Sequence, residues 1–117
     1  MKVLFITRPT VFTGPGGDTV QLLKTQEYLK RLNIKVDIAN DAYPSLEGYD
    51  VIHFFNLRNP QDILHNVLRV KQAGIPSVLS TIWGSYLECD QKCRKGLSKW
   101  VANNVSEYKL EYLKVIA

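Results

Sequence analysis

Hydrophobic residues cluster along the chain in short runs that have the length of β-strands. These runs cover residues 2–7, 34–39, 51–55 and 76–80. The first run is a continuous apolar segment, which is typical of parallel strands that are covered on both faces, and the third is apolar except for His53. The second run alternates apolar with charged residues, which indicates a strand nearer the edge of a sheet. The pattern therefore predicts a sheet in which the third strand is central and the second is peripheral.

Three segments show the periodicity of helices, at residues 18–32, 60–73 and 106–116. The first begins at Asp18, whose carboxylate can cap the free amides of a first helical turn. The second begins with Asn59 as a cap and Pro60 at the first helical position, and it ends at Gly74. Two of these helices connect strands, which favours parallel pairing through right-handed crossovers.

The order of these elements predicts the fold class. It is α/β, a Rossmann-like three-layer sandwich with a mainly parallel sheet in a strand order of about 3-2-1-4. The 117 residues, 45% of them hydrophobic and 22% charged, have the length and composition of a folded globular domain. We therefore expect residues 1–117 to form a single domain.

The sequence lacks the features that mark membrane and metal proteins. No apolar stretch approaches the roughly 20 residues that span a bilayer, and the first strand begins at Lys2 with no signal peptide before it. We therefore expect a cytoplasmic location. Cys89 and Cys93 are too few for a disulfide framework or a zinc site, so no metal or other cofactor is expected. His53, within an apolar strand, is expected to be a hydrogen-bonded core residue.

The net charge of +4 comes from basic residues spread along the chain, so anionic partners are permitted but not required. One denser basic group consists of Lys92, Arg94, Lys95 and Lys99, with Trp100 beside it. Such a group can contact an anionic membrane, which would place the protein peripherally at the inner membrane face. A solvated basic face is the commoner explanation. No nucleic-acid partner is expected, because basic and aromatic residues do not interleave on the predicted sheet.

A glycine-rich loop follows the first strand, with the sequence Gly-Pro-Gly-Gly-Asp at residues 14–18. Bare backbone at the amino end of a helix suits an anion or a sugar hydroxyl, although the glycines can also serve only to permit the turn. A dinucleotide fingerprint is not matched, because residues 8–13 separate strand and loop and Thr19 stands where the third glycine is needed. No Gly-Lys-Ser/Thr follows the glycines, so a triphosphatase P-loop is not indicated.

Motifs spread over nearly the whole chain share the order and spacing of one enzyme family. They are the strand at residues 2–7, Gly16-Gly17-Asp18 at a helix start, and the strand at residues 49–53 followed by Asn56. In these motifs the chain resembles the start of family 4 glycosyltransferases. The resemblance implies the GT-B fold, in which two Rossmann-like domains face each other across a cleft, with this chain as the N-terminal, acceptor-side domain. It also implies a retaining transfer of a sugar from a nucleotide-sugar donor to a carbohydrate or lipid-linked acceptor.

The resemblance further implies roles for individual residues. Gly16 and Gly17 would form the loop that approaches the donor diphosphate, and Asp18 would cap the helix and bind a hydroxyl. The acceptor-side residues would be Asn56, Trp83, Gly84 and Ser85. The ring of Trp83 can stack on a sugar, and packing against the following helix is an equal alternative. No catalytic residue is assigned.

The chain also departs from the family pattern. It has no two glutamates eight positions apart, the pair that contacts the donor in the second domain, and the loop after the fourth strand lacks a histidine often found there. Only four strands are predicted, and the chain ends in the apolar residues 115–117. We therefore expect the C-terminal, donor-binding domain to be absent from this chain and this piece alone to be inactive.

A non-catalytic, flavodoxin-like ligand-binding or interaction module is the alternative from another class of protein. A phosphate-receiving signalling domain of this kind needs an acidic cluster after the first strand and an aspartate ending the third. Thr7-Arg8 and Asn56 occupy these places, which disfavours a signalling role.

Overall fold

The computed structural model describes residues 1–57 and 60–82, together with residues 92, 96, 100, 104–106 and 109. By its internal contacts the chain divides into two units, residues 1–83 and 84–117. The first unit contains every helix and strand described below. The predicted cap Asn59 and nearly all of the predicted helix at 106–116 lie outside the described residues.

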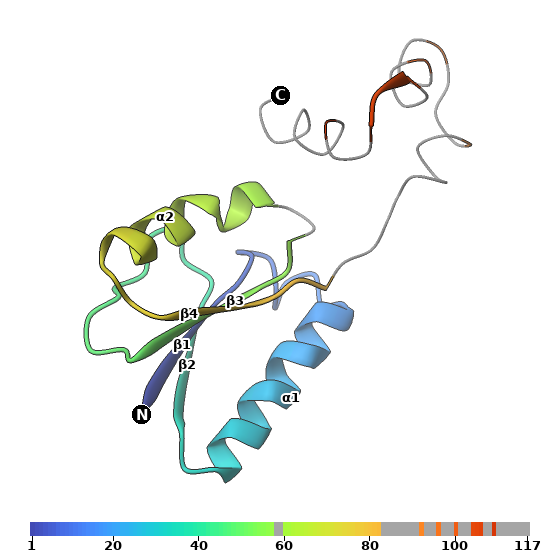
Figure 1. Ribbon diagram of the computed structural model, residues 1–117. Coiled ribbons are helices and arrows are strands. Elements are labelled where there is room, and N and C mark those ends of the chain that lie inside the picture. The colour runs from blue at the N-terminus through green and yellow to red at the C-terminus, as the bar shows by residue number, and fades with distance from the viewer. Residues whose placement is uncertain are drawn as a thin grey trace. The chain divides into compact units, whose positions relative to one another are not determined.

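Four strands and two α-helices make up the first unit (Figure 1). In chain order they are β1 (Lys2–Ile6), α1 (Gly17–Arg31), β2 (Lys35–Ala39), β3 (Val51–Phe55), α2 (Leu64–Gln72) and β4 (Ser77–Ser80). Each strand lies where its hydrophobic run predicts it. Pro60 opens a short 3₁₀ helix, Pro60–Asp62, and α2 begins only at Leu64.

The strands form one parallel sheet in the order β2-β1-β3-β4. The α/β class and the parallel sheet are therefore confirmed, whereas the expected order 3-2-1-4 is corrected to 2-1-3-4. β3 lies inside the sheet because both of its faces are apolar: Ile52 faces one helix layer and Phe55 the other. β2 is an edge strand, as its alternating pattern predicts, with Lys35 and Asp37 exposed.

The two helices cover opposite faces of the sheet, which gives the predicted three layers (Figure 1). On the α1 face, Leu22 packs in a buried cluster with Phe5 and Phe55, whose ring centroids are 4.8 Å apart. On the α2 face, Val70 packs in a second cluster with Phe54. Burial of one such side chain stabilises the fold by about 1.5–3 kcal/mol.

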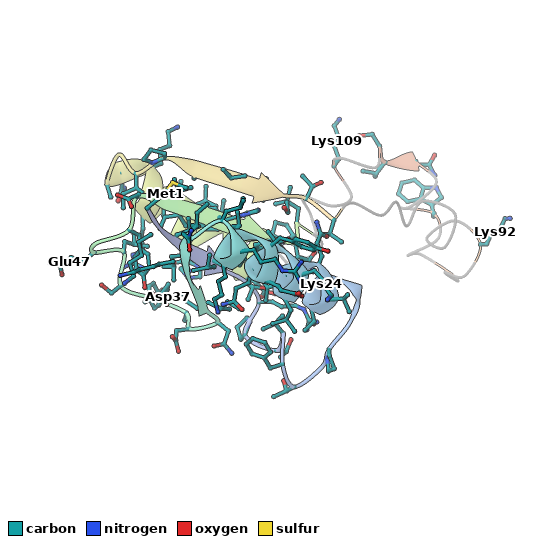
Figure 2. The ribbon with its side chains drawn as sticks, turned by 90° about the horizontal axis from the view of Figure 1, so that it is seen from below. Met1, Lys24, Asp37, Glu47, Lys92 and Lys109 are labelled. Carbon is teal, nitrogen blue, oxygen red and sulfur yellow. The ribbon has the colours of Figure 1, made fainter. Side chains whose placement is uncertain are left out.

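Charged side chains lie on the outside of these layers, as Lys24 on α1 and Asp37 on β2 illustrate (Figure 2). The Asp37 carboxylate pairs with the Lys2 amine at 3.2 Å and accepts a hydrogen bond from the Tyr49 hydroxyl at 2.9 Å. The hydrogen bond from Tyr49 and that from Lys2 hold the pKa of Asp37 below its usual value. Asp37 is therefore part of a surface ion pair at the sheet edge.

β4 is the least covered strand of the sheet. Its side chains Val78 and Leu79 are 52% and 44% exposed. An apolar groove of about 270 Å³ lies along this strand, lined by Phe54, Ile63 and Val67 among others. Within the described part of the chain, no helix is both long and apolar enough to cross a membrane.

Candidate functional site

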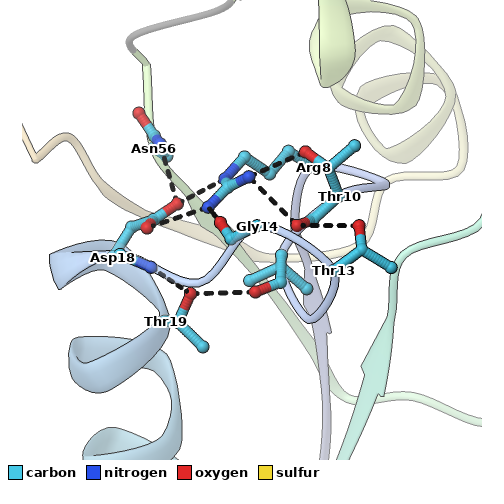
Figure 3. A network of polar contacts seen from close by, with 9 residues as sticks. Arg8, Thr10, Thr13, Gly14, Asp18, Thr19 and Asn56 are labelled. Atoms are coloured by element: carbon cyan, nitrogen blue, oxygen red, sulfur yellow. Dashed lines mark hydrogen bonds and ion pairs between the residues drawn. The ribbon is translucent and has the colours of Figure 1, made fainter.

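The strand order fixes where a ligand site is expected. In an open parallel sheet, ligands bind beyond the carboxyl ends of the strands, at the point where the order of strands reverses. With the order 2-1-3-4 this point lies between β1 and β3, because β2 lies on one side of β1 and β3 on the other. The residues that follow these two strands, Arg8 and Asn56, meet there with Asp18 from the start of α1 (Figure 3).

Arg8 holds the loop after β1 against the start of α1. Its Nε donates to Asp18 Oδ2 at 2.6 Å and its Nη2 donates to Asp18 Oδ1 at 3.2 Å. Nη2 also donates to the Gly14 carbonyl at 2.7 Å, and Nη1 donates to the carbonyl and hydroxyl of Thr10 at 3.1 and 2.7 Å. A guanidinium has five N–H donors, so these five bonds occupy all of them. Arg8 is therefore a cross-link within the loop and has no donor left for a ligand in this conformation.

Asp18 is ionised and almost enclosed. Its side chain is 10% exposed and, besides the two bonds from Arg8, its Oδ2 accepts one from Asn56 Nδ2 at 3.1 Å. The hydrogen bond from Arg8, followed by that from Asn56, lowers the pKa of Asp18 to about 2. Its charge also lies at the positive end of the α1 dipole, which stabilises it further. The ion pair with Arg8 therefore persists throughout the physiological pH range.

The helix cap differs from the prediction. Gly16 is the N-cap of α1, and Asp18 lies in the first turn. Asp18 is not the cap because its carboxylate is drawn to Arg8, across the loop. The Gly16 amide donates to Thr19 Oγ1 at 3.1 Å, which closes the cap.

Gly16 and Gly17 are both exposed at the carboxyl edge of the sheet. A Cβ atom on Gly16 would lie 3.0 Å from Asp18 Oδ1, so a side chain there would disturb the Asp18 carboxylate. A Cβ atom on Gly17 would meet nothing within 4 Å. The amide of Gly17 belongs to the first helical turn, whose N–H groups have no acceptor within the helix. The two glycines thus present main chain to solvent beside the Arg8–Asp18 pair.

Asn56 is a buried residue at the end of β3 that contacts the Arg8–Asp18 pair. It is 8% exposed, and its backbone φ of 73° lies in the left-handed region, which asparagine tolerates better than most residues. Its amide nitrogen is the donor to Asp18 described above. The structure therefore brings Asn56 together with the glycine loop. Its contact with an acceptor sugar stays a prediction.

Two further features of the site were not predicted. Val11 is fully buried in the cluster that contains Leu22 and Phe55, and its carbonyl accepts a 2.9 Å hydrogen bond from Thr19 Oγ1. The next residue, Phe12, is 50% exposed. Arg8 was also not assigned a role, although an arginine directly after a strand and an aspartate at the following helix start form a recognisable pair of opposite charges.

Several predicted residues lie outside the described part of the chain. They are Trp83, Gly84 and Ser85 on the acceptor side, and Cys89 and Cys93. Arg94, Lys95 and Lys99 of the basic group also lie outside the described residues. Lys92 and the adjoining Trp100 are described, and Trp100 is 63% exposed. Among the residues that are described, no three His, Cys, Asp or Glu side chains gather as metal ligands would.

His53 is hydrogen-bonded, as expected, but it is only half-buried and belongs to neither buried cluster of the core. Its Nε2 lies 2.9 Å from Ser80 Oγ, and its ring stacks on Phe55 with centroids 4.1 Å apart. Burial lowers the pKa of the His53 imidazole. The neutral ring therefore joins β3 to β4 on the α1 face.

Comparisons of this chain with protein-family models, with curated proteins and with solved structures gave no match. The resemblance to family 4 glycosyltransferases therefore rests on the motif residues of this chain alone.

Proposed function

We propose that this chain is the N-terminal, acceptor-side domain of a GT-B glycosyltransferase. The full enzyme would move a sugar from a nucleotide-sugar donor to a carbohydrate or lipid-linked acceptor. The observation that carries the proposal is the exposed Gly16-Gly17 turn at the amino end of α1, at the carboxyl ends of the neighbouring strands β1 and β3. A bulky side chain at this turn would keep a large ligand away from the main chain.

In the proposed reaction, a hydroxyl of the acceptor replaces the nucleoside diphosphate at the anomeric carbon of the donor sugar. The leaving diphosphate gains negative charge as its bond to the sugar breaks. First-turn amides near Gly17 are fixed dipoles that would stabilise this charge without reorganisation. Arg8 offsets the charge of Asp18 at 2.6 Å, so Asp18 does not leave an unpaired negative charge beside the diphosphate. Anomeric retention follows from the family resemblance.

A flavodoxin-like binding module is the second candidate, and the strand order favours it. The order 2-1-3-4 is that of the first four strands of the flavodoxin-like sheet, which binds FMN at its β1–β3 switch point. The two candidates place a ligand at the same edge of the sheet. They differ in the chemistry of that ligand, a sugar nucleotide or a flavin phosphate.

Calorimetric titrations of the chain with UDP-glucose, GDP-mannose and FMN separate the two candidates. Because the donor-binding domain is expected to be absent, the proposal predicts weak, saturable binding of at least one sugar nucleotide through its diphosphate, and no binding of FMN. A graded pair of variants, Gly17→Ala and Gly17→Val, tests the site, because the space around this Cβ lets the fold accept both side chains. Affinity should fall in the order wild type, Gly17→Ala, Gly17→Val. Binding of FMN alone, or equal affinities in all three proteins, would contradict the proposal.

A further inference from the structure

The loop between β1 and α1 turns an apolar tip toward solvent beside the glycines. Phe12 is 50% exposed, and its neighbours Pro9 and Pro15 are exposed as well. The adjacent Val11 points the other way and is fully buried. The loop is thus anchored in the core by one apolar side chain and leaves the larger one outside.

Hydrogen bonds hold this tip in one conformation. The Gly14 amide donates to the Thr10 carbonyl at 2.8 Å, which closes a turn around Phe12. Arg8 binds both Thr10 and Gly14 from the inside, and the Val11 carbonyl is held by Thr19. A side chain on a fixed backbone loses little freedom when a ligand packs against it, and an aromatic ring has only two torsions to restrict.

The two charged residues that flank the loop, Arg8 and Asp18, pair with each other, so their charges cancel. Arg8 uses all of its N–H donors within the protein, and Asp18 is its direct partner. Residues 9–17 contain no lysine or arginine. Within residues 8–18 the chain therefore offers an exposed apolar ring and no cation outside the Arg8–Asp18 pair, which suits a neutral ligand with an apolar face. A membrane surface or an acidic partner would need basic side chains at this position.

We propose that Phe12 is a stacking platform for one pyranose ring of a carbohydrate acceptor. The C–H groups on one face of a pyranose are apolar and pack against an aromatic ring, while the hydroxyls at its rim remain free for hydrogen bonds. This proposal rests on the proposed function and assigns the acceptor sugar to the loop after β1. Phe12 fixes the position of the acceptor and takes no part in bond making.

Titration of the nitrogen-15-labelled chain with maltose, cellobiose and lactose tests the proposal by NMR. Wild type should bind at least one disaccharide with shifts of the amides at residues 10–14, 16 and 17. Phe12→Ala should weaken that binding about three- to tenfold, as expected for the loss of one stacking contact, whereas Phe12→Tyr should keep it. The matched control is Tyr28→Ala: Tyr28 is 58% exposed and lies on α1, 11 residues beyond Gly17, which is about 16 Å along the helix axis. This control should not change the affinity.

Any other result overturns the proposal, and the results differ in whether the proposed function fails with it. If wild type binds a disaccharide and shifts the loop amides, but Phe12→Ala binds equally well, the platform is wrong and the proposed function stands. If no disaccharide perturbs the loop, the platform and the acceptor-side function are both wrong. If Phe12→Ala instead abolishes sedimentation with phosphatidylcholine–phosphatidylglycerol vesicles and leaves sugar binding unchanged, the loop contacts lipid. The spectrum of each variant shows directly whether it is folded.

Discussion

Replacing Arg8 by glutamine should destabilise the fold and do so in a pH-dependent way. The substitution removes the charge and the Nε–Asp18 bond of 2.6 Å, while its shorter amide cannot span from Asp18 to Thr10 and Gly14. Asp18 would then stay almost enclosed with only part of its partners. Removing one partner of a largely enclosed ion pair is costly, because the charge that remains is shielded from water and has lost its partner.

The magnitude follows from the pKa of Asp18. A folded pKa of about 2, against about 3.9 in an unfolded chain, corresponds to about 2.5 kcal/mol of stability at neutral pH. Arg8 is the larger cause of that pKa and Asn56 the smaller, so Arg8→Gln should cost about 2 kcal/mol. Because the folded pKa is depressed, this contribution is fully present above the unfolded pKa. It is lost as the pH falls through the folded pKa.

Urea unfolding of wild type and variant, followed by circular dichroism between pH 7 and pH 2, measures this directly. The difference in unfolding free energy should be about 2 kcal/mol at pH 7 and should shrink as the pH falls below about 4. The control is Arg31→Gln, because Arg31 pairs with Glu27 on the exposed side of α1 and should cost less than about 0.5 kcal/mol. A loss at pH 7 no larger than that of the control, or a loss that is constant down to pH 2, refutes the assigned role of Arg8.

Substitutions at four positions have further expected outcomes. Gly16→Ala should lower the unfolding free energy by about 1–2 kcal/mol because its Cβ meets Asp18, whereas Gly17→Ala should change it by less than about 0.5 kcal/mol; urea unfolding compares them. Asn56→Ala should cost about 1 kcal/mol more than Asn56→Gly in the same assay, since glycine accepts the positive φ. His53 should titrate below pH 6.5 in proton NMR, and between pH 6.5 and about 5 the stability of wild type should decline more than that of His53→Gln.

The sequence predicts β1, β2 and β3 well because the residues of each strand reveal how it is covered. β1 is apolar from Val3 to Ile6 and β3 is apolar except for His53, and both are covered on both faces, whereas the exposed charges of β2 mark it as an edge. The strand order could not be obtained in the same way. An apolar strand could pair with β1 on either side. Which side β3 takes depends on how the helices pack, and no local sequence pattern predicts that packing.

The position of the candidate site residues in the fold was predicted in part, whereas ligand binding by them stays a prediction. A glycine turn at a strand end identifies Gly16 and Gly17 from position alone, and the structure joins Asn56 to them through Asp18. The role of Arg8 depends on a loop that brings it within 2.6 Å of a residue ten positions later. No periodicity in the sequence predicts that contact. The same loop conformation decides that Val11 is buried and Phe12 is exposed.

The central claim is that the exposed backbone amides of Gly16 and Gly17, at the start of α1, bind a sugar nucleotide. The most direct measurement is the amide resonance of Gly17 during titration of the nitrogen-15-labelled chain with UDP-glucose and GDP-mannose. We predict a saturable shift of this resonance with at least one of them, and no saturable shift in the neighbouring amides of Gly17→Val. A Gly17 resonance that stays in place while amides elsewhere in the chain respond would contradict the claim.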